Sequence, residues 1–332
     1  MIGAIIGDIV GSSHEFNNIK TTKFNLFDKK SRYTDDSAMT MAVAEWLLDD
    51  AEHTHKVLED KMVKYGSLNP GAGYGGMFFG WLFLSEKLFK SGKRQPYNSF
   101  GNGAAMRVSP VAHWFEDVNE VLDAAAATAQ PSHNHEEGIK GAQTVALAIF
   151  KALSYHRYQE APLHIDEILH ECVEFSGYDI NMPKSSVLNR FDETCQGTVP
   201  VALKIISMAT CYEDAVRLAV SLGADADTLG AIVGSIAEAI WGIPMKLRHQ
   251  VENFLPDDMH SVLLRFRIAR PWSFKPLIDT TFSGDDFSDV SWEVLYDMDG
   301  KEAYDEIMSK TKSEHARKRL LMAERAKARD NW

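Results

Sequence analysis

The sequence has few cysteines and no long uninterrupted hydrophobic run. Only three cysteines occur in 332 residues, Cys172, Cys195 and Cys211, and their irregular spacing excludes a disulfide framework or a zinc cage. This usage fits a reducing compartment, so we expect a cytoplasmic protein. The most compact apolar run, Met77 to Leu84, is far shorter than the roughly 20 residues that a membrane-spanning helix needs. The stretch Met1 to Asp8 lacks the cationic region of an export signal, and we expect no membrane association.

Basic residues are also outnumbered by acidic ones. The 35 Lys and Arg residues face 47 Asp and Glu residues, which gives a net charge of −12. Nucleic-acid-binding surfaces need clustered cations that contact phosphates, so no nucleic-acid partner is expected. The composition changes near Arg270-Pro271. We therefore predict a main domain over residues 1–270 and a C-terminal extension over 271–332 that is partly helical and has a basic end.

Strand-forming patterns are scarce, and helical periodicity dominates. Apolar residues recur at helical spacing over Asp36–Leu48 and over Leu229–Ile240, and Gly242 and Pro244 end the second of these segments. Further helices are predicted over Ile139–Leu153, Val199–Ala209 and Tyr212–Val220. Without alternating Val, Ile and Thr runs, a parallel sheet would have no strands. The sequence therefore predicts an all-α fold.

Three glycines recur every four residues near the start of the chain. Gly3, Gly7 and Gly11 lie within an apolar stretch, so in a helix they would share one face. Small residues at this spacing let a neighbouring backbone approach closely. The pattern predicts a buried packing helix.

Two clusters of carboxylates and hydroxyls stand at predicted helix starts. They are Thr34-Asp35-Asp36-Ser37 and Asp225-Ala226-Asp227-Thr228. Each alone is also typical of an ordinary N-cap, because side-chain oxygens accept hydrogen bonds from free backbone N–H groups. If the two helix starts faced one another, four carboxylates would converge and would require cations. Oxygen ligands without His or Cys select Mg²⁺, Mn²⁺ or Ca²⁺, and this number of ligands suggests two ions.

Two other polar segments are candidates for substrate binding. The segment Gly101–Arg107 places two glycines around an asparagine, an arrangement that can present backbone N–H groups to a phosphate or can form a simple turn. The segment Ser132–Glu137 contains two histidines that could bind a substrate. Helix capping and surface exposure explain the same polar residues equally well.

Taken in order, these segments resemble the ADP-ribosylglycohydrolase family, which includes the dinitrogenase reductase-activating glycohydrolase. The stretches that carry the resemblance are Gly3-Ala4-Ile5-Ile6-Gly7-Asp8 with Glu15-Phe16, Thr34-Asp35-Asp36-Ser37, Gly101-Asn102-Gly103-Ala104-Ala105-Met106-Arg107, Ser132-His133 and Gly223-Ala224-Asp225-Ala226-Asp227-Thr228. They span about residues 1 to 245. Ser37 stands where the family usually has Thr, and Ala224 where it usually has Gly, but no ligand position is lost.

The resemblance implies a compact, single-domain, all-α orthogonal helical bundle with two Mg²⁺ ions in a central cleft, where Mn²⁺ could replace Mg²⁺. The metal ligands that it implies are Thr34, Asp35, Asp36, Asp225, Asp227 and Thr228. The pyrophosphate of the substrate would lie on Gly101, Asn102, Gly103, Ala104 and Met106. His133 would contact the distal ribose region, and Tyr74 would line the adenosine end. Glu15 would lie beside the metals as a gating or acid–base carboxylate.

The activity that the resemblance implies is hydrolysis of the bond between the distal ribose of ADP-ribose and a protein side chain, with arginine the favoured acceptor. A rival hypothesis is an immunity or regulatory protein of the same fold that counteracts an ADP-ribosyltransferase by binding it. A third is a phosphohydrolase that uses the same carboxylates. The intact ligand set favours the glycohydrolase, so the expected partner is an ADP-ribosylated protein, with a transferase as the alternative.

Overall fold

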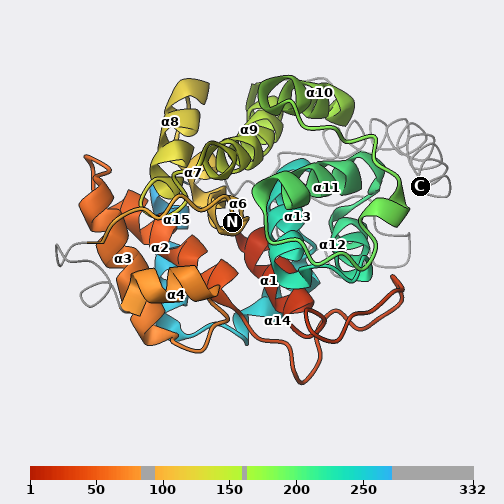
Figure 1. The fold of residues 1–332 in the computed structure, drawn as a ribbon, viewed down its shortest axis with the longest axis horizontal. Coiled ribbons are helices and arrows are strands. Elements are labelled where there is room, and N and C mark those ends of the chain that lie inside the picture. Colours follow the sequence, from red (N-terminus) through yellow and green to blue (C-terminus); the bar gives the residue numbers. More distant parts are fainter. Residues whose placement is uncertain (84–93, 159–162, 271–332) are drawn as a thin grey trace, which may run out of the picture.

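The computed structural model describes residues 1–83, 94–158 and 163–270, and these ranges form helices joined by loops, without strands (Figure 1). The helices are α1 (Ile2–Ser12), α2 (Asp35–Asp49), α3 (His55–Leu68), α4 (Gly76–Phe83), α6 (Gly103–Met106), α7 (Ser109–Trp114), α8 (Val118–Ala129), α9 (Glu136–Tyr158), α10 (Ile165–Ser176), the 3₁₀ turn η1 (Lys184–Ser186), α11 (Cys195–Met208), α12 (Tyr212–Ser221), α13 (Ala226–Trp241), α14 (Met245–Glu252) and α15 (Asp257–Ala269). The predicted all-α fold is confirmed. The extension predicted for 271–332 lies outside the described residues.

The helices expected from periodicity are present, and α9, α11 and α13 start three or four residues earlier than predicted. Helix α11 begins at Cys195 because the side chain of Thr194 caps it and accepts a hydrogen bond from the Gly197 N–H at 3.0 Å. Helix α9 begins at Glu136, so its acidic first turn belongs to the helix. Helix α13 ends as predicted, because Gly242 adopts a φ of 73° that favours glycine.

Helices α1 and α13 pack side by side at the centre of the molecule (Figure 1). Their backbones touch at the predicted glycine positions: a Cβ atom on Gly7 would lie 1.9 Å from the carbonyl oxygen of Gly230, and one on Gly3 would lie 2.3 Å from that of Gly234. No other residue type fits there. A Cβ atom on Gly11 would likewise lie 2.2 Å from the Ala226 carbonyl oxygen, so the start of α13 lies beside the last turn of α1, one turn beyond Asp8.

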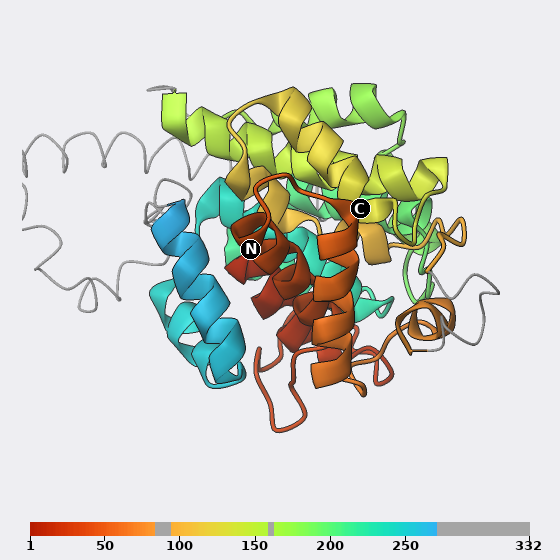
Figure 2. The ribbon, with the colours of Figure 1, turned by 90° about the vertical axis from the view of Figure 1, so that its left-hand side faces the viewer.

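Other helices enclose this pair. Helices α14 and α15 lie on one side of it, and the long helix α9 crosses above (Figure 2). Helix α2 is fastened to α3 and α15 by ion pairs, in which Asp49 binds both Lys61 and Arg265. These ion pairs hold the far end of α2 near the surface, whereas its start at Asp36 is buried.

Within the described ranges, no helix is both long enough and apolar enough to span a membrane.

Candidate active site

A buried aspartate on α1 organises the centre of the site. Asp8 is fully buried, and its carboxylate accepts hydrogen bonds from the Thr34 backbone N–H at 2.9 Å, the Thr34 hydroxyl at 2.7 Å and the Ser37 N–H at 3.1 Å. The Ser37 hydroxyl also donates to it. Sequence reasoning did not assign Asp8 a role. The available signal was a single carboxylate inside an otherwise apolar helix.

The polar residues at the two helix starts do not cap their own helices. Thr34 precedes α2 and Asp225 precedes α13, yet neither side chain makes a capping hydrogen bond. The Thr34 hydroxyl instead lies 2.7 Å from Asp8 and 3.0 Å from Asp36. Capping therefore does not account for the two clusters, and their side chains are directed toward one another.

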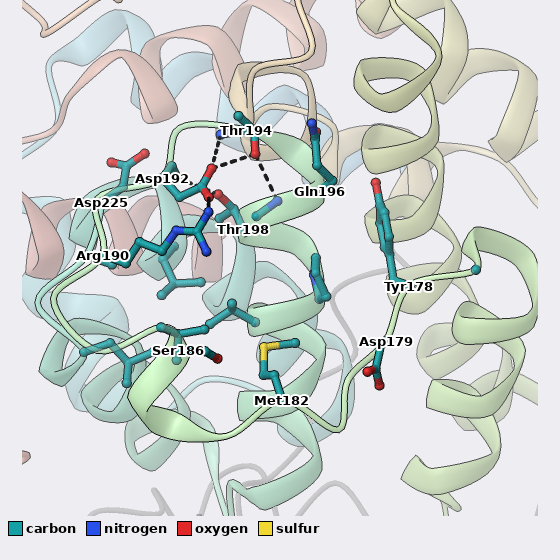
Figure 3. A pocket seen from close by; sticks show the side chains of 18 residues that line it. Tyr178, Asp179, Met182, Ser186, Arg190, Asp192, Thr194, Gln196, Thr198 and Asp225 are labelled. Atoms are coloured by element: carbon teal, nitrogen blue, oxygen red, sulfur yellow. Dashed lines mark hydrogen bonds and ion pairs between the residues drawn. The ribbon is translucent and has the colours of Figure 1, made fainter.

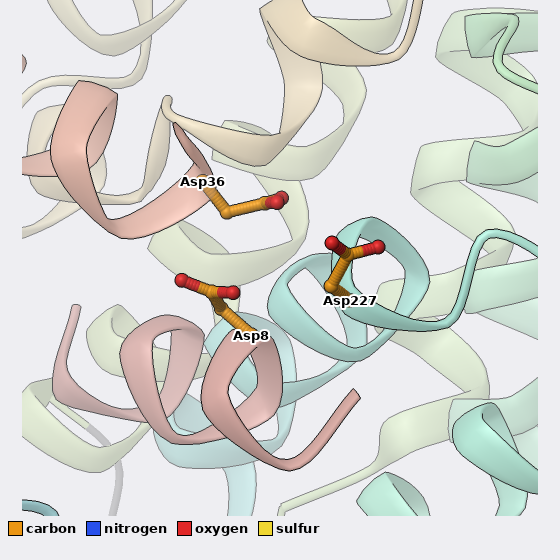
Figure 4. A group of neighbouring side chains, drawn as sticks. All are labelled: Asp8, Asp36 and Asp227. Atoms are coloured by element: carbon orange, nitrogen blue, oxygen red, sulfur yellow. The ribbon is translucent and has the colours of Figure 1, made fainter. Parts of the chain in front are cut away.

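The carboxylates of three helices converge (Figure 4). Oxygen atoms of Asp8, Asp36 and Asp227 lie within 4.8 Å of one another. A second group, with oxygens equally close, consists of Glu15, Asp225 and Asp227. Because Asp227 belongs to both groups, the two form one continuous cluster.

Burial makes this cluster reluctant to carry full negative charge. Burial, together with the charge of Asp227, raises the pKa of Asp8 to about 7. The same two causes raise the pKa of Glu15 to about 8. Burial and then neighbouring carboxylates also raise the pKa well above its usual range for Asp35, Asp36 and Asp225. Without a cation, the group is electrostatically strained.

The donor set fits a divalent cation such as Mg²⁺ or Mn²⁺. One carboxylate oxygen of Asp36, Oδ1, is buried and has no hydrogen-bond partner within the described residues. The Thr228 hydroxyl lies 3.5 Å from the other oxygen. A cation would both neutralise the carboxylates and coordinate the unpartnered oxygen, and oxygen-only ligands suit Mg²⁺ or Mn²⁺.

The glycine-containing loop is tied directly to this cluster through Asn102. The Asn102 side-chain amide donates to Asp225 at 2.7 Å and lies 3.1 Å from the Thr198 hydroxyl. Its backbone N–H donates to the Glu193 carbonyl at 2.7 Å. The side chain of Asn102 therefore sets the distance between the loop and the carboxylates.

The two glycines of the loop lie against a histidine. A Cβ atom on Gly103 would lie 3.0 Å from His133 Nε2, and one on Gly101 would lie 3.4 Å from it. Ala104 and Met106 are buried in α6, so their side chains face the core. Most backbone N–H groups of the loop are already paired, because those of Gly101, Asn102 and Ala105 donate to other protein oxygens. Among the described residues of the loop, the Gly103 N–H has no partner, so this group and the adjacent imidazole nitrogen are what the loop can present to a phosphate.

His133 is held in the interior. Its ring is in contact with those of Phe78 and Tyr97, with centroids 6.2 and 6.0 Å away, and burial lowers its pKa well below the ordinary value. Helix capping was the alternative explanation for the segment Ser132–Glu137, and it applies to His135. The Nδ1 atom of His135 accepts a hydrogen bond from the Glu137 N–H at 3.1 Å. The two histidines therefore have different roles, and only His133 faces the loop.

The ADP-ribosylglycohydrolase family has a sequence model that matches residues 1–273. The chain belongs to this family. It is 25% identical to mouse ADP-ribosylhydrolase ARH3, over 78% of this chain and 88% of that protein. It is 22% identical to the ADP-ribosylarginine hydrolase Tri1 of Pseudomonas putida, over 73% of this chain and 70% of that protein.

A solved structure supports the same fold. It is described as an ADP-ribosylglycohydrolase-related protein complex, and it aligns with a TM-score of 0.60 at 22% identity, covering 81% of this chain and 95% of that one. Family membership makes the protein a glycosyl hydrolase that acts on ADP-ribosyl bonds.

In this glycohydrolase the glycine-rich stretch before α4 packs on the carboxylate cluster. The Asp35 N–H donates to the Ala72 carbonyl at 2.9 Å, and a Cβ on Gly73 would lie 3.5 Å from Asp35 Oδ1. Burial and, to a smaller extent, the negative charge of Asp35 raise the pKa of Tyr74. Tyr74 thus lies near Asp35, and its assignment to the adenosine end stays a prediction.

A cavity of about 610 Å³ adjoins the glycohydrolase site and shares Asp225 with it (Figure 3). It lies between α11 and the loop that follows α10. Its polar side chains are largely paired with each other: Arg190 lies 3.2 Å from Asp192, and the Thr194 hydroxyl donates to Asp192 at 2.6 Å. The cavity includes neither His133 nor the glycine loop, so the carboxylate cluster is the stronger candidate for the chemistry.

Proposed function

We propose that the protein is a Mg²⁺-dependent hydrolase that releases ADP-ribose from a modified protein side chain, with arginine as the favoured acceptor. The observation that carries this proposal is that two clusters of three carboxylates, which share Asp227, lie beside a glycine loop that could contact a phosphate. The first gives a place for a divalent ion and the second a place for an anionic substrate.

Two ions would be held by the predicted ligands, which are Thr34, Asp35, Asp36, Asp225, Asp227 and Thr228. Mn²⁺ offers the same coordination chemistry. Bound Mg²⁺ would supply Lewis acidity toward the hydroxyls of the distal ribose and toward water. Asp8 positions one of these ligands, because it accepts hydrogen bonds from the backbone N–H and the hydroxyl of Thr34.

The chain's own residues place the substrate. The glycine loop and His133 receive the pyrophosphate and the distal ribose region, and Asn102 fixes that loop relative to Asp225. The scissile bond is thereby held beside the carboxylates, which stabilise positive charge that develops on the ribose during cleavage.

Glu15 has the position of an acid–base group. Its carboxylate lies with those of Asp225 and Asp227, and it is partly exposed, unlike its two neighbours. A carboxyl group with a raised pKa can hold a proton on one oxygen near neutral pH and exchange it with water or the leaving group.

Arginine as the acceptor is supported by the surface next to Glu15. Phe16 is 85% exposed and stacks on the exposed Phe191, with ring centroids 6.5 Å apart. Guanidinium groups stack on aromatic faces and pair with carboxylates, which both occur here. The relative Tri1 is named for hydrolysis at ADP-ribosylarginine.

The test is incubation with arginine-linked and serine-linked ADP-ribosyl proteins, with and without Mg²⁺, followed by mass analysis of the products. We expect free ADP-ribose from the arginine-linked protein only when Mg²⁺ is present. Release of a phosphate product would instead indicate a phosphohydrolase. Absence of any product, together with stable binding to a transferase, would favour the regulatory hypothesis.

A further inference from the structure

An arginine lies deep in the core behind the glycine loop. Arg107 is fully buried, and burial lowers its pKa only to about 10, so the guanidinium is charged at neutral pH. It donates to the Thr128 carbonyl at 2.8 Å and to the Ser132 hydroxyl at 3.0 Å. Its Nε and Nη1 have no hydrogen-bond partner within the described residues. Its Cζ lies 5.5 Å from the centroid of the Phe78 ring, but a buried charge with two unpaired nitrogens is still costly.

The guanidinium sets the direction of a chain of hydrogen bonds. Ser132 Oγ lies 2.7 Å from His133 Nδ1. Because a guanidinium has donors and no acceptor, the Ser132 oxygen must accept from Arg107. The second lone pair of this oxygen would also allow it to accept from His133. The Ser132 hydroxyl hydrogen, however, has no other acceptor among the hydrogen bonds of the described residues, so it points at His133 Nδ1, which accepts it.

The direction of these hydrogen bonds determines the tautomer of His133. With Nδ1 as the acceptor, a neutral ring carries its hydrogen on Nε2. Nε2 is the atom that faces the loop, at 3.0 Å from the Cβ position of Gly103. An N–H donor on this side suits an anionic ligand, whereas a bare nitrogen would repel it.

We propose that Arg107 is a positioning residue which, through Ser132, holds His133 in the tautomer that presents Nε2–H to the glycine loop. The part of this inference that concerns the ligand rests on the proposed function, because that function places a pyrophosphate on the loop. The hydrogen-bond chain itself is a property of the free protein.

The first test measures the tautomer in the free, full-length protein. The 12 histidines are labelled with ¹⁵N, and the His133 ring is identified by comparison with the variant His133→Gln. Long-range ¹H–¹⁵N spectra should show a protonated Nε2 and an unprotonated Nδ1 throughout neutral pH. A ring protonated on Nδ1, or on both nitrogens, would overturn the proposal.

The role of Arg107 is tested by two substitutions. Arg107→Lys keeps a charged, donor-only group and should preserve the tautomer, whereas Arg107→Met should allow the second tautomer to appear. Full retention of the Nε2–H form in a folded Arg107→Met protein would remove Arg107 from the chain. If that variant does not fold, the Ser132→Ala variant tests the same series of hydrogen bonds.

A double-mutant cycle on Ser132 measures the effect on binding. In calorimetric titrations with ADP-ribose, Ser132→Ala should weaken binding about tenfold when His133 is present. In the His133→Gln background the same change should alter binding less than about twofold, because glutamine has no Nδ1 to orient. Equal losses in both backgrounds would make Ser132 a merely structural residue.

Ser235→Ala is the matched control. Ser235 is also buried and its hydroxyl also makes a 2.7 Å hydrogen bond, but to a carbonyl within α13. It should leave both the His133 spectrum and ADP-ribose binding unchanged. If the wild-type protein did not bind ADP-ribose, the proposed function would fail, while the spectra would still decide whether the chain of hydrogen bonds exists.

Discussion

Neutralising one buried carboxylate should stabilise the metal-free protein and remove its response to Mg²⁺. Asp36 is 1% exposed, and one of its carboxylate oxygens lies within 4.8 Å of oxygens of both Asp8 and Asp227. In the substitution Asp36→Asn, the shape of the side chain is kept and one negative charge is lost. If the cluster exists to bind a cation, this variant should be more stable than the wild type without metal and less responsive with it.

The magnitude follows from the separations in the cluster. Two unit charges within 4.8 Å repel by about 3 kcal/mol or more at an effective dielectric constant of about 20. Proton uptake by the carboxylates relieves part of this repulsion, so we expect a gain of about 1 to 3 kcal/mol. At about 2 °C per kcal/mol for a domain of this size, the metal-free Tm should rise by about 2 to 6 °C.

Mg²⁺ should raise the Tm of the wild type more than that of the Asp36→Asn variant. An ion present at about 100 times its Kd stabilises the wild type by about 2.7 kcal/mol, or roughly 5 °C in Tm. The Asp36→Asn variant should gain less than about 1 °C. Thermal unfolding in a chelator and in millimolar Mg²⁺, followed by circular dichroism, measures both numbers.

Asp49→Asn provides the control on the same helix. Asp49 pairs with Lys61 and Arg265, and these partners lower its pKa against an opposing effect of burial. Loss of its charge should lower Tm slightly, by less than about 2 °C, equally with and without Mg²⁺. The reasoning is refuted if Asp36→Asn lowers the metal-free Tm, or if it keeps the full Mg²⁺-induced shift.

Three further substitutions, the last with a matched control, test two other residues of the site and the helix contact that supports it. Asp227→Ala should abolish turnover while circular dichroism shows unchanged helix content, and measurable activity at saturating Mg²⁺ would contradict the shared-ligand assignment. Glu15→Gln should keep ADP-ribose binding in calorimetry but lose turnover by roughly 10²- to 10⁴-fold, and lost binding would instead make Glu15 a structural residue. Gly7→Ala should destabilise the fold by about 3 kcal/mol or more in denaturant titrations, whereas Gly71→Ala, with no neighbour within 4 Å, should change stability by less than about 0.5 kcal/mol.

The features that sequence could predict were local. The helices around Val43 and Ile236 follow from periodicity, and the packing of α1 follows from glycines spaced by four residues. Each depends on residues close together in the chain. The two carboxylate clusters at helix starts were recognisable locally as well, but their convergence was only a condition for a cation site, because nothing in either cluster identifies the other as its partner.

The features that sequence could not predict involve partners far apart in the chain. Asp8 binds Thr34, 26 residues away, and Asn102 binds Asp225, 123 residues away. A lone aspartate in an apolar helix, or an asparagine in a turn, has no neighbouring pattern that names its partner. The resemblance implied that Asn102 binds substrate with the loop, and its hydrogen bond to Asp225, which ties the loop to the carboxylates, is apparent only from the fold.

The glycine contact between α1 and α13 and the carboxylate cluster depend on each other. Close approach of these helices brings Asp8 and Asp227 together, which costs electrostatic energy that the backbone contact and surrounding core must offset. Larger residues at Gly7 would relieve the repulsion by separating the helices, and would thereby destroy the cation site. Strain at the cluster is thus a consequence of holding a binding site in place before the ion arrives, and a stabilising substitution there is expected to cost activity.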